Sequence, residues 1–128
     1  MRKFIISIDQ GTTSSRAILF DLKGKPIFVS QMEFTQYFPK DGWVEHDPEE
    51  IWITTKKVLK NVISKSKKLK GKILTIGITN QRETTVLWNK KTGKPVYRAI
   101  VWQDRRTANL CENLKRKGVD KKIQKITG

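Results

Sequence analysis

Two apolar segments of this chain each run directly into a cluster of side chains suited to binding polar ligands. Residues 78–85 read ITNQRETT after an apolar run that begins at residue 73, and residues 99–107 read AIVWQDRRT. An apolar, β-branched run fixes the backbone of a buried strand, and the functional groups then lie at the strand end. Both segments therefore predict strands that deliver a polar site.

The first third of the chain predicts three further strands. Residues 4–9 and 16–21 are apolar runs, and a turn at residues 21–26 leads into a third strand that ends at residue 33. Together these segments predict an antiparallel meander whose first turn contains a glycine, two threonines and a serine.

The residues that follow position 46 predict a helix. Asp47 is a suitable N-cap, Pro48 suits the first helical position, and Glu50 stands at the spacing of a capping box. The apolar side chains fall on one side, so the helix should pack on the sheet. These side chains are Ile51, Trp52, Val58, Leu59, Val62 and Ile63. Trp43, Trp52 and Trp88 are interpreted as core or hairpin packing residues.

The remaining chain predicts one more buried strand, a hairpin and two helical segments. The expected ranges are 73–79 for the strand, 84–88 and 95–101 for the hairpin, and 107–117 and 120–126 for the helical segments. Gly118 should end the first of these helices. This order of strands and helices predicts a mixed α/β domain.

The turn between the first two strands has the composition of a phosphate-binding loop. Gly11 permits a tight turn and a close backbone approach. Amide groups and the hydroxyls of Thr12, Thr13 and Ser14 would then face phosphate oxygens. An ordinary hairpin turn explains the same residues about as well, and the P-loop pattern Gly-x4-Gly-Lys-Ser/Thr is absent.

Two charged residues flank this turn. Asp9 ends the first strand and would hold Mg²⁺ through the water shell of the ion, because Mg²⁺ gives up its water reluctantly. Arg16 would add positive charge beside a terminal phosphate.

Arg82 and Glu83 form a second candidate site. A guanidinium fork beside a two-oxygen acceptor suits a small polyhydroxylated molecule, and Trp102 would supply an apolar wall against its carbons. A structural ion pair is the alternative, although surface pairs seldom follow an apolar strand so closely. Residues 103–106 are expected to fix a strand-to-helix corner. His46 precedes the helix cap and is not interpreted as a catalytic base.

The composition limits the classes of function. The single cysteine, Cys111, excludes an intramolecular disulfide and suggests a cytoplasmic location. No apolar run approaches the ~20 residues of a membrane helix, so no membrane span is expected. The formal net charge of +15 raises the question of nucleic acid. Its lysines are scattered without alternating aromatics, which is typical of a solvated surface, and no nucleic-acid partner is expected.

Residues 9–16, 78–85 and 99–107 together resemble the carbohydrate-kinase family, in particular its glycerol-phosphorylating members. The resemblance runs along essentially the whole chain. It implies an α/β domain with the ribonuclease H-like fold of actin and hexokinase, a mixed sheet, and an incomplete domain in this chain. It further implies an ATP-dependent enzyme that transfers the γ-phosphoryl of MgATP to glycerol and yields sn-glycerol 3-phosphate.

The resemblance also implies roles for individual residues. Residues 11–14 and Arg16 would bind the ATP phosphates, with Asp9 near the metal. Arg82 and Glu83 would hydrogen-bond the glycerol hydroxyls, and Trp102 would pack on the glycerol carbons.

Residues 1–128 would then be an N-terminal carbohydrate-kinase domain that stops before its end, with the second domain absent. No catalytic base is expected in this chain, so little or no kinase activity is expected of it alone. The full-length protein would be able to form oligomers. Two alternatives stay open: another sugar kinase of the same family, or a non-catalytic basic module that binds nucleic acid or another anion.

Overall fold

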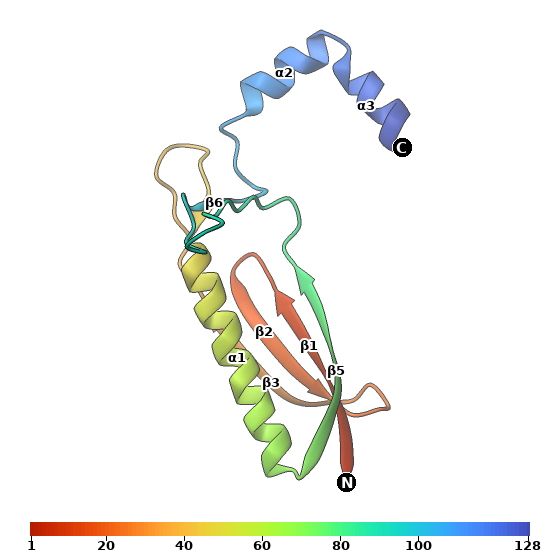
Figure 1. Ribbon diagram of the computed structural model, residues 1–128. Helices are drawn as coiled ribbons and strands as arrows, with labels where there is room; N and C mark the ends of the chain where they lie inside the picture. The colour runs from red at the N-terminus through yellow and green to blue at the C-terminus, as the bar shows by residue number, and fades with distance from the viewer.

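A four-stranded sheet with one long helix beside it forms the main body of the chain (Figure 1). The computed structural model describes residues 1–128. Its elements are β1 (Arg2–Gln10), β2 (Ser14–Phe20), β3 (Pro26–Glu33), β4 (Glu45–His46), α1 (Pro48–Lys68), β5 (Gly71–Asn80), β6 (Ala99–Ile100), α2 (Ala108–Arg116) and α3 (Val119–Thr127). This order confirms the mixed α/β class that the sequence predicts.

The sheet is mixed and has the strand order β3-β2-β1-β5. Strands β1, β2 and β3 form the predicted antiparallel meander, whereas β5 lies parallel to β1 after the chain has passed through α1. Gln10 of β1 pairs in register with Asn80 of β5. The parallel pairing brings the C-terminal ends of β1 and β5 to one edge of the sheet, so the loops that follow them are neighbours.

Alternate residues of β1 and β2 point into an apolar core against α1. Ile6 and Leu19 are fully buried there with Val58 and Val62 of the helix. The complete cluster is Phe4, Ile6, Ile8, Ala17, Leu19, Val58 and Val62. Each large aliphatic side chain buried in this way contributes roughly 1.5–3 kcal/mol, which holds β1 and the loop after it in place.

The start of α1 is set by Asp47 as predicted, but the predicted capping box is not formed. The Asp47 carboxylate accepts the backbone N–H of Glu49 at 2.9 Å. The Glu50 carboxylate instead accepts the backbone N–H of Thr35 and the hydroxyl of Tyr37. Spacing within the helix could not reveal these donors, because they come from the loop after β3. Glu50 therefore ties that loop to α1.

Two predictions of burial are wrong. Trp52 is 59% exposed, so it is not a core residue, whereas the similarly exposed Trp88 lies in the predicted hairpin, bridged to Pro95. The strand at residues 73–79 is also not buried, because Ile78 of β5 is 74% exposed. β5 is an edge strand with a neighbour on one side only, and the body of the chain leaves much of its apolar surface open.

The predicted hairpin after residue 84 is present as isolated bridges rather than as two regular strands. Isolated bridges join Thr85 to Ile100 and Trp88 to Pro95, and no regular strand forms at residues 84–88. The two residues of β6 also pair with β4, a strand from much earlier in the chain, so Ile100 has Thr85 on one side and Glu45 on the other. The predicted hairpin partners are therefore confirmed, whereas the predicted strands are reduced to isolated bridges and the two residues of β6. The pairing with β4 was not predicted, because long-range pairing leaves no local pattern in the sequence.

The last two helices confirm the predicted helical segments. Gly118 lies between α2 and α3 with φ 70°, a left-handed conformation that glycine adopts without strain. Thr107 occupies the N-cap of α2 but makes no side-chain capping bond. Figure 1 shows both helices extending away from the sheet, and neither contains a buried residue. None of the helices combines the length and apolar character needed to cross a membrane.

Candidate substrate pocket

A polar pocket of about 450 Å³ lies where β1 and β5 end. Its lining residues come from three segments that are distant in the sequence. They are Thr12, Asn80, Gln81, Arg82, Glu83 and Trp102. The structure thus brings one residue of the predicted phosphate loop together with all three residues of the predicted polyol site.

The backbone itself joins the two strand ends. The N–H of Gln81 donates to the carbonyl of Gln10 at 2.7 Å, one residue beyond the last ladder pair of β1 and β5. The loop after β1 and the residues after β5 are therefore held side by side by main-chain contacts, before any side chain is considered.

Arg82 and Glu83 are exposed in this pocket and are not paired with each other. The five ion pairs of the structure involve neither residue, so the structural ion pair considered as an alternative is not formed. Glu83 has φ 59°, a left-handed conformation that costs a non-glycine residue roughly 1–2 kcal/mol. A strained backbone and two unpaired charges at one strand end are typical of a ligand site.

Trp102 also lines the pocket. Its side chain is 52% exposed, and its indole Nε1–H donates to the hydroxyl of Thr12 at 3.0 Å. This bond fixes the plane of the indole beside the loop after β1. The face of the indole remains available to carbon atoms of a ligand.

A buried corner holds Trp102 in position. The carboxylate of Asp104 accepts the backbone N–H of Val44 at 2.7 Å, and it accepts three hydrogen bonds from Arg106. Arg106 also reaches the fully buried Glu45 at 2.8 Å. Hydrogen bonds from Arg106 lower the pKa of Asp104 to about 2, and the pKa of Arg106 is raised in turn. Asp104 and Arg106 thus fix this corner as predicted.

The loop after β1 is a tight turn with engaged hydroxyls. The N–H of Gly11 donates to the carbonyl of Ser14 at 3.0 Å, and the Ser14 hydroxyl accepts from Gln31 at 2.9 Å. At the start of β2, the buried hydroxyl of Ser15 contacts Thr54 and Thr55 of α1. The loop is therefore anchored to the helix as well as to the sheet.

Asp9 and Arg16 occupy facing positions on β1 and β2 and form an ion pair. Both side chains remain partly exposed, at 34% and 43%. Arg16 therefore already has a carboxylate partner, and any phosphate that it contacts has to share it with Asp9.

The architecture agrees with what comparisons with known proteins find. The domain model for the N-terminal domain of the FGGY family of carbohydrate kinases matches residues 4–128. The chain belongs to the FGGY family of carbohydrate kinases.

Its curated relatives include many glycerol kinases. The glycerol kinase of Petrotoga mobilis is 59% identical over 128 residues, which are 100% of this chain and 26% of that protein. The glycerol kinase of Thermoanaerobacter pseudethanolicus is 61% identical over the same shares. This FGGY chain thus spans about a quarter of the length of the curated relatives that it matches.

Solved structures confirm the predicted fold class. The glycerol kinase of Plasmodium falciparum, solved with ADP, has a TM-score of 0.82 at 38% identity and covers 91% of this chain and 23% of that chain. The gluconate kinase of Lactobacillus acidophilus has a TM-score of 0.86 at 23% identity, covering 98% and 25%, and shows the fold alone.

The loop after β1 in this FGGY domain fits a phosphate group. Because the Thr12 hydroxyl accepts from Trp102, its own proton is free to donate to a phosphate oxygen. No cluster of three or more His, Cys, Asp or Glu side chains is placed to hold a metal ion. The single carboxylate of Asp9 fits Mg²⁺ that keeps most of its waters and takes its other ligands from phosphates.

Sequence reasoning missed the importance of His46 and Glu45. Both are almost completely buried in β4. His46 contacts Gln36 and Gln81, and Glu45 accepts from Tyr97 and Arg106. The signal available in the sequence was a glutamate followed by the single histidine, directly after the apolar residues Trp43 and Val44.

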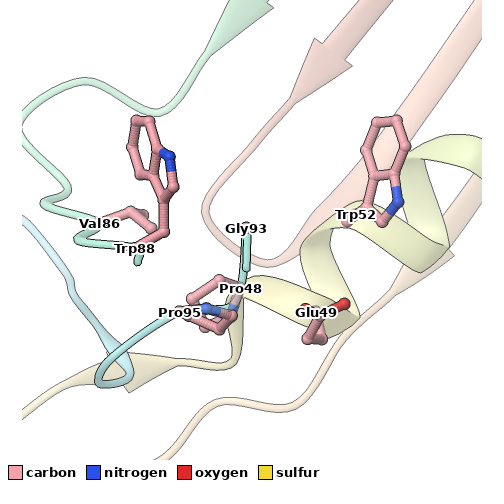
Figure 2. A pocket seen from close by; sticks show the side chains of 7 residues that line it. All are labelled: Pro48, Glu49, Trp52, Val86, Trp88, Gly93 and Pro95. Atoms are coloured by element: carbon pink, nitrogen blue, oxygen red, sulfur yellow. The ribbon is translucent and has the colours of Figure 1, made fainter. Parts of the chain in front are cut away.

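A second hollow of about 530 Å³ lies at the start of α1 and is of a different character (Figure 2). Figure 2 shows Trp52 and Trp88 on opposite sides of it, above Pro48 and Pro95. Glu49 is the only charged residue that lines it. Because it gathers apolar surface and few hydrogen-bonding groups, this hollow suits a polyol and phosphates less well than the pocket at Arg82.

Proposed function

We propose that this chain is the N-terminal part of an ATP-dependent glycerol kinase. The reaction would transfer the γ-phosphoryl of MgATP to a primary hydroxyl of glycerol and yield sn-glycerol 3-phosphate. The observation that carries the proposal is the shared pocket, in which Thr12 of the loop after β1 lies with Arg82, Glu83 and Trp102. Membership of the FGGY family and 55–61% identity to glycerol kinases support it.

Arg82, Glu83 and Trp102 would bind glycerol. The guanidinium of Arg82 donates hydrogen bonds and the carboxylate of Glu83 accepts them, so together they satisfy hydroxyl groups in both directions. The exposed indole of Trp102 would pack on the carbon skeleton. A site that leaves its polar groups unpaired with the wrong ligand rejects that ligand, which would give selectivity.

Residues 11–14 and Arg16 would bind the phosphates of ATP, and Asp9 would hold Mg²⁺ through water. Phosphoryl transfer depends mainly on positioning and on neutralising the charge of the transferred group, and bound Mg²⁺ supplies part of that neutralisation. The contribution of this chain is to hold the phosphate loop next to the polyol site, through the pairing of β1 with β5.

Several parts of the reaction would lie outside residues 1–128. A general base on the attacking hydroxyl is expected in a second domain, so the isolated chain should show little or no kinase activity. The working enzyme would be cytoplasmic, would bind no nucleic acid and would be able to form oligomers.

Calorimetric titration of this chain with glycerol tests the pocket directly. We expect heat of binding in the wild-type chain, its loss in Arg82→Ala, and unchanged heat in Arg116→Ala, an exposed arginine of α2. Circular dichroism would first establish that all three proteins are folded. A folded wild-type chain without glycerol heat, or equal heat in Arg82→Ala, would refute a preformed glycerol site.

A further inference from the structure

His46 lies at the centre of a chain of hydrogen bonds that joins the two halves of the candidate site. Its side chain is fully buried, and both ring nitrogens have partners. Nε2 lies 2.6 Å from Oε1 of Gln36, and Nδ1 lies 3.2 Å from Nε2 of Gln81. The imidazole therefore has no contact with solvent and two fixed contacts within the protein.

The outer ends of this chain are the phosphate loop and the polyol strand end. The side-chain amide of Gln36 donates to the carbonyl of Thr12 at 3.2 Å. On the other side, Gln81 lines the pocket next to Arg82, and its side-chain oxygen accepts from the hydroxyl of Thr84 at 3.0 Å.

With a neutral imidazole, the hydrogen bonds from Gln36 through His46 to Gln81 can have only one donor and acceptor order. The NH₂ group of Gln36 donates to the carbonyls of Thr12 and Phe34, which can only accept, so the oxygen of Gln36 faces His46. The proton of the neutral ring then lies on Nε2, which donates to the oxygen of Gln36. Nδ1 then accepts from the NH₂ group of Gln81, and the oxygen of Gln81 is left to accept from the Thr84 hydroxyl.

The ring plane is fixed by packing as well. The ring of Phe34 meets the imidazole edge to face, with centroids 5.0 Å apart and planes at 77°. Rotation of His46 would break this contact and both hydrogen bonds, so the ring is held in one orientation.

We propose that His46 is a positioning residue, a neutral imidazole protonated at Nε2 that holds the phosphate loop and the polyol strand end at a fixed separation. This inference rests on the proposed kinase function, because it assigns His46 a task in aligning the two substrates. It goes beyond that function by naming a buried residue that touches neither substrate. Such a residue acts through Gln36 and Gln81, by limiting the motion of Thr12 relative to Arg82.

The protonation state provides a readout that does not depend on activity. Nitrogen NMR of the ¹⁵N-labelled chain identifies which ring nitrogen of His46 carries the proton, and His46 is the only histidine. We expect the Nε2–H form. A proton on Nδ1, or a ring that exchanges between both forms, would overturn the proposed direction of the hydrogen-bond chain.

Three variants then separate positioning from simple stability. His46→Leu removes both hydrogen bonds and should weaken glycerol binding by about tenfold, whereas His46→Gln keeps a donor and an acceptor and should stay within about threefold. Val62→Ala, a core variant far from the pocket, loses stability but should bind glycerol like the wild-type chain. Calorimetry with glycerol measures all of them.

Equal glycerol affinity in His46→Leu and Val62→Ala would overturn the positioning role, and so would an affinity of His46→Gln as low as that of His46→Leu. If the wild-type chain binds no glycerol, the pocket assignment fails. The NMR result alone then tests the hydrogen-bond chain, so failure of the glycerol site and failure of the His46 proposal can be told apart.

Discussion

Glu83 combines a functional position with an unfavourable backbone conformation. Its left-handed φ of 59° disfavours any residue with a Cβ, yet the proposed glycerol site needs its carboxylate. Nothing in the sequence around Arg82 signalled this strain, because positive φ depends on how the chain leaves β5. A residue kept in a costly conformation at a pocket is consistent with selection for binding rather than for stability.

Replacement of Glu83 therefore separates stability from binding. Glu83→Gly should have a free energy of unfolding about 1 kcal/mol higher than Glu83→Ala, because glycine adopts the left-handed conformation without a steric penalty. Both variants should lose glycerol binding alike. Urea denaturation and calorimetry measure the two effects, and an alanine variant as stable as the glycine variant would contradict the strain.

His46 gives the chain a specific dependence of stability on pH. Burial lowers its pKa below the ordinary value, and the charge of Glu50 opposes this only in part. As the pH falls through about 6.5, the unfolded chain takes up a proton that the folded chain does not, so the free energy of unfolding decreases. The loss levels off below the folded pKa.

Urea denaturation between about pH 7.5 and about pH 5.5 tests this dependence, in a window above the ordinary pKa of carboxylates. The slope should be present in the wild-type chain and flattened in His46→Gln, which has no titrating ring. An equal slope in both proteins would assign the effect to other groups.

At the scale of elements, the corner formed by Asp104 and Arg106 after β6 holds Trp102 in position. Asp104→Asn removes a charge that Arg106 and the backbone of Val44 both contact. Breaking one partner of a buried ion pair typically costs about 3–5 kcal/mol, so we expect a loss of this order in urea denaturation. Asp120→Asn at the exposed first turn of α3 is the matched control and should change stability by less than about 0.5 kcal/mol.

The same substitution should affect the pocket. Trp102 would lose its fixed backbone, so glycerol affinity measured by calorimetry should weaken. An Asp104→Asn chain with unchanged stability would mean that the buried corner does not hold this part of the fold.

The elements also show what a sequence can and cannot predict. The meander and α1 follow from local periodicity and from Asp47, and the structure confirms them. The pairing of β6 with β4 joins Glu45 to Ile100, and no local pattern encodes a partner so distant. Arg82 and Trp102 could be named from the sequence because each follows an apolar strand segment. The contacts of His46 could not be predicted, because Gln36 and Gln81 reach it from 10 and 35 residues away.

At the scale of the whole molecule, much of the surface is open. The edge strand β5 exposes apolar side chains, and α2 and α3 extend from the body without burying a residue. The net charge of +15 is spread over a surface with five ion pairs. We propose that the remaining parts of a complete kinase supply the general base and the second domain.

The isolated chain should consequently be inactive as a kinase. With MgATP and glycerol, residues 1–128 should form no sn-glycerol 3-phosphate above background, because the general base and the second domain are proposed to lie outside them. A coupled assay for the product tests this. Clear turnover that disappears in Arg82→Ala would contradict the proposal that the general base and the second domain lie outside residues 1–128.

A chimeric enzyme tests most directly whether residues 1–128 form the N-terminal part of a glycerol kinase. Residues 1–128 would replace the corresponding quarter of the Petrotoga mobilis glycerol kinase, to which they are 59% identical. We expect ATP-dependent formation of sn-glycerol 3-phosphate, a kcat/KM at least about a hundredfold lower in Arg82→Ala, and no change in Arg116→Ala. A folded chimera that does not phosphorylate glycerol, or one that does so equally well without Arg82, would contradict this proposal.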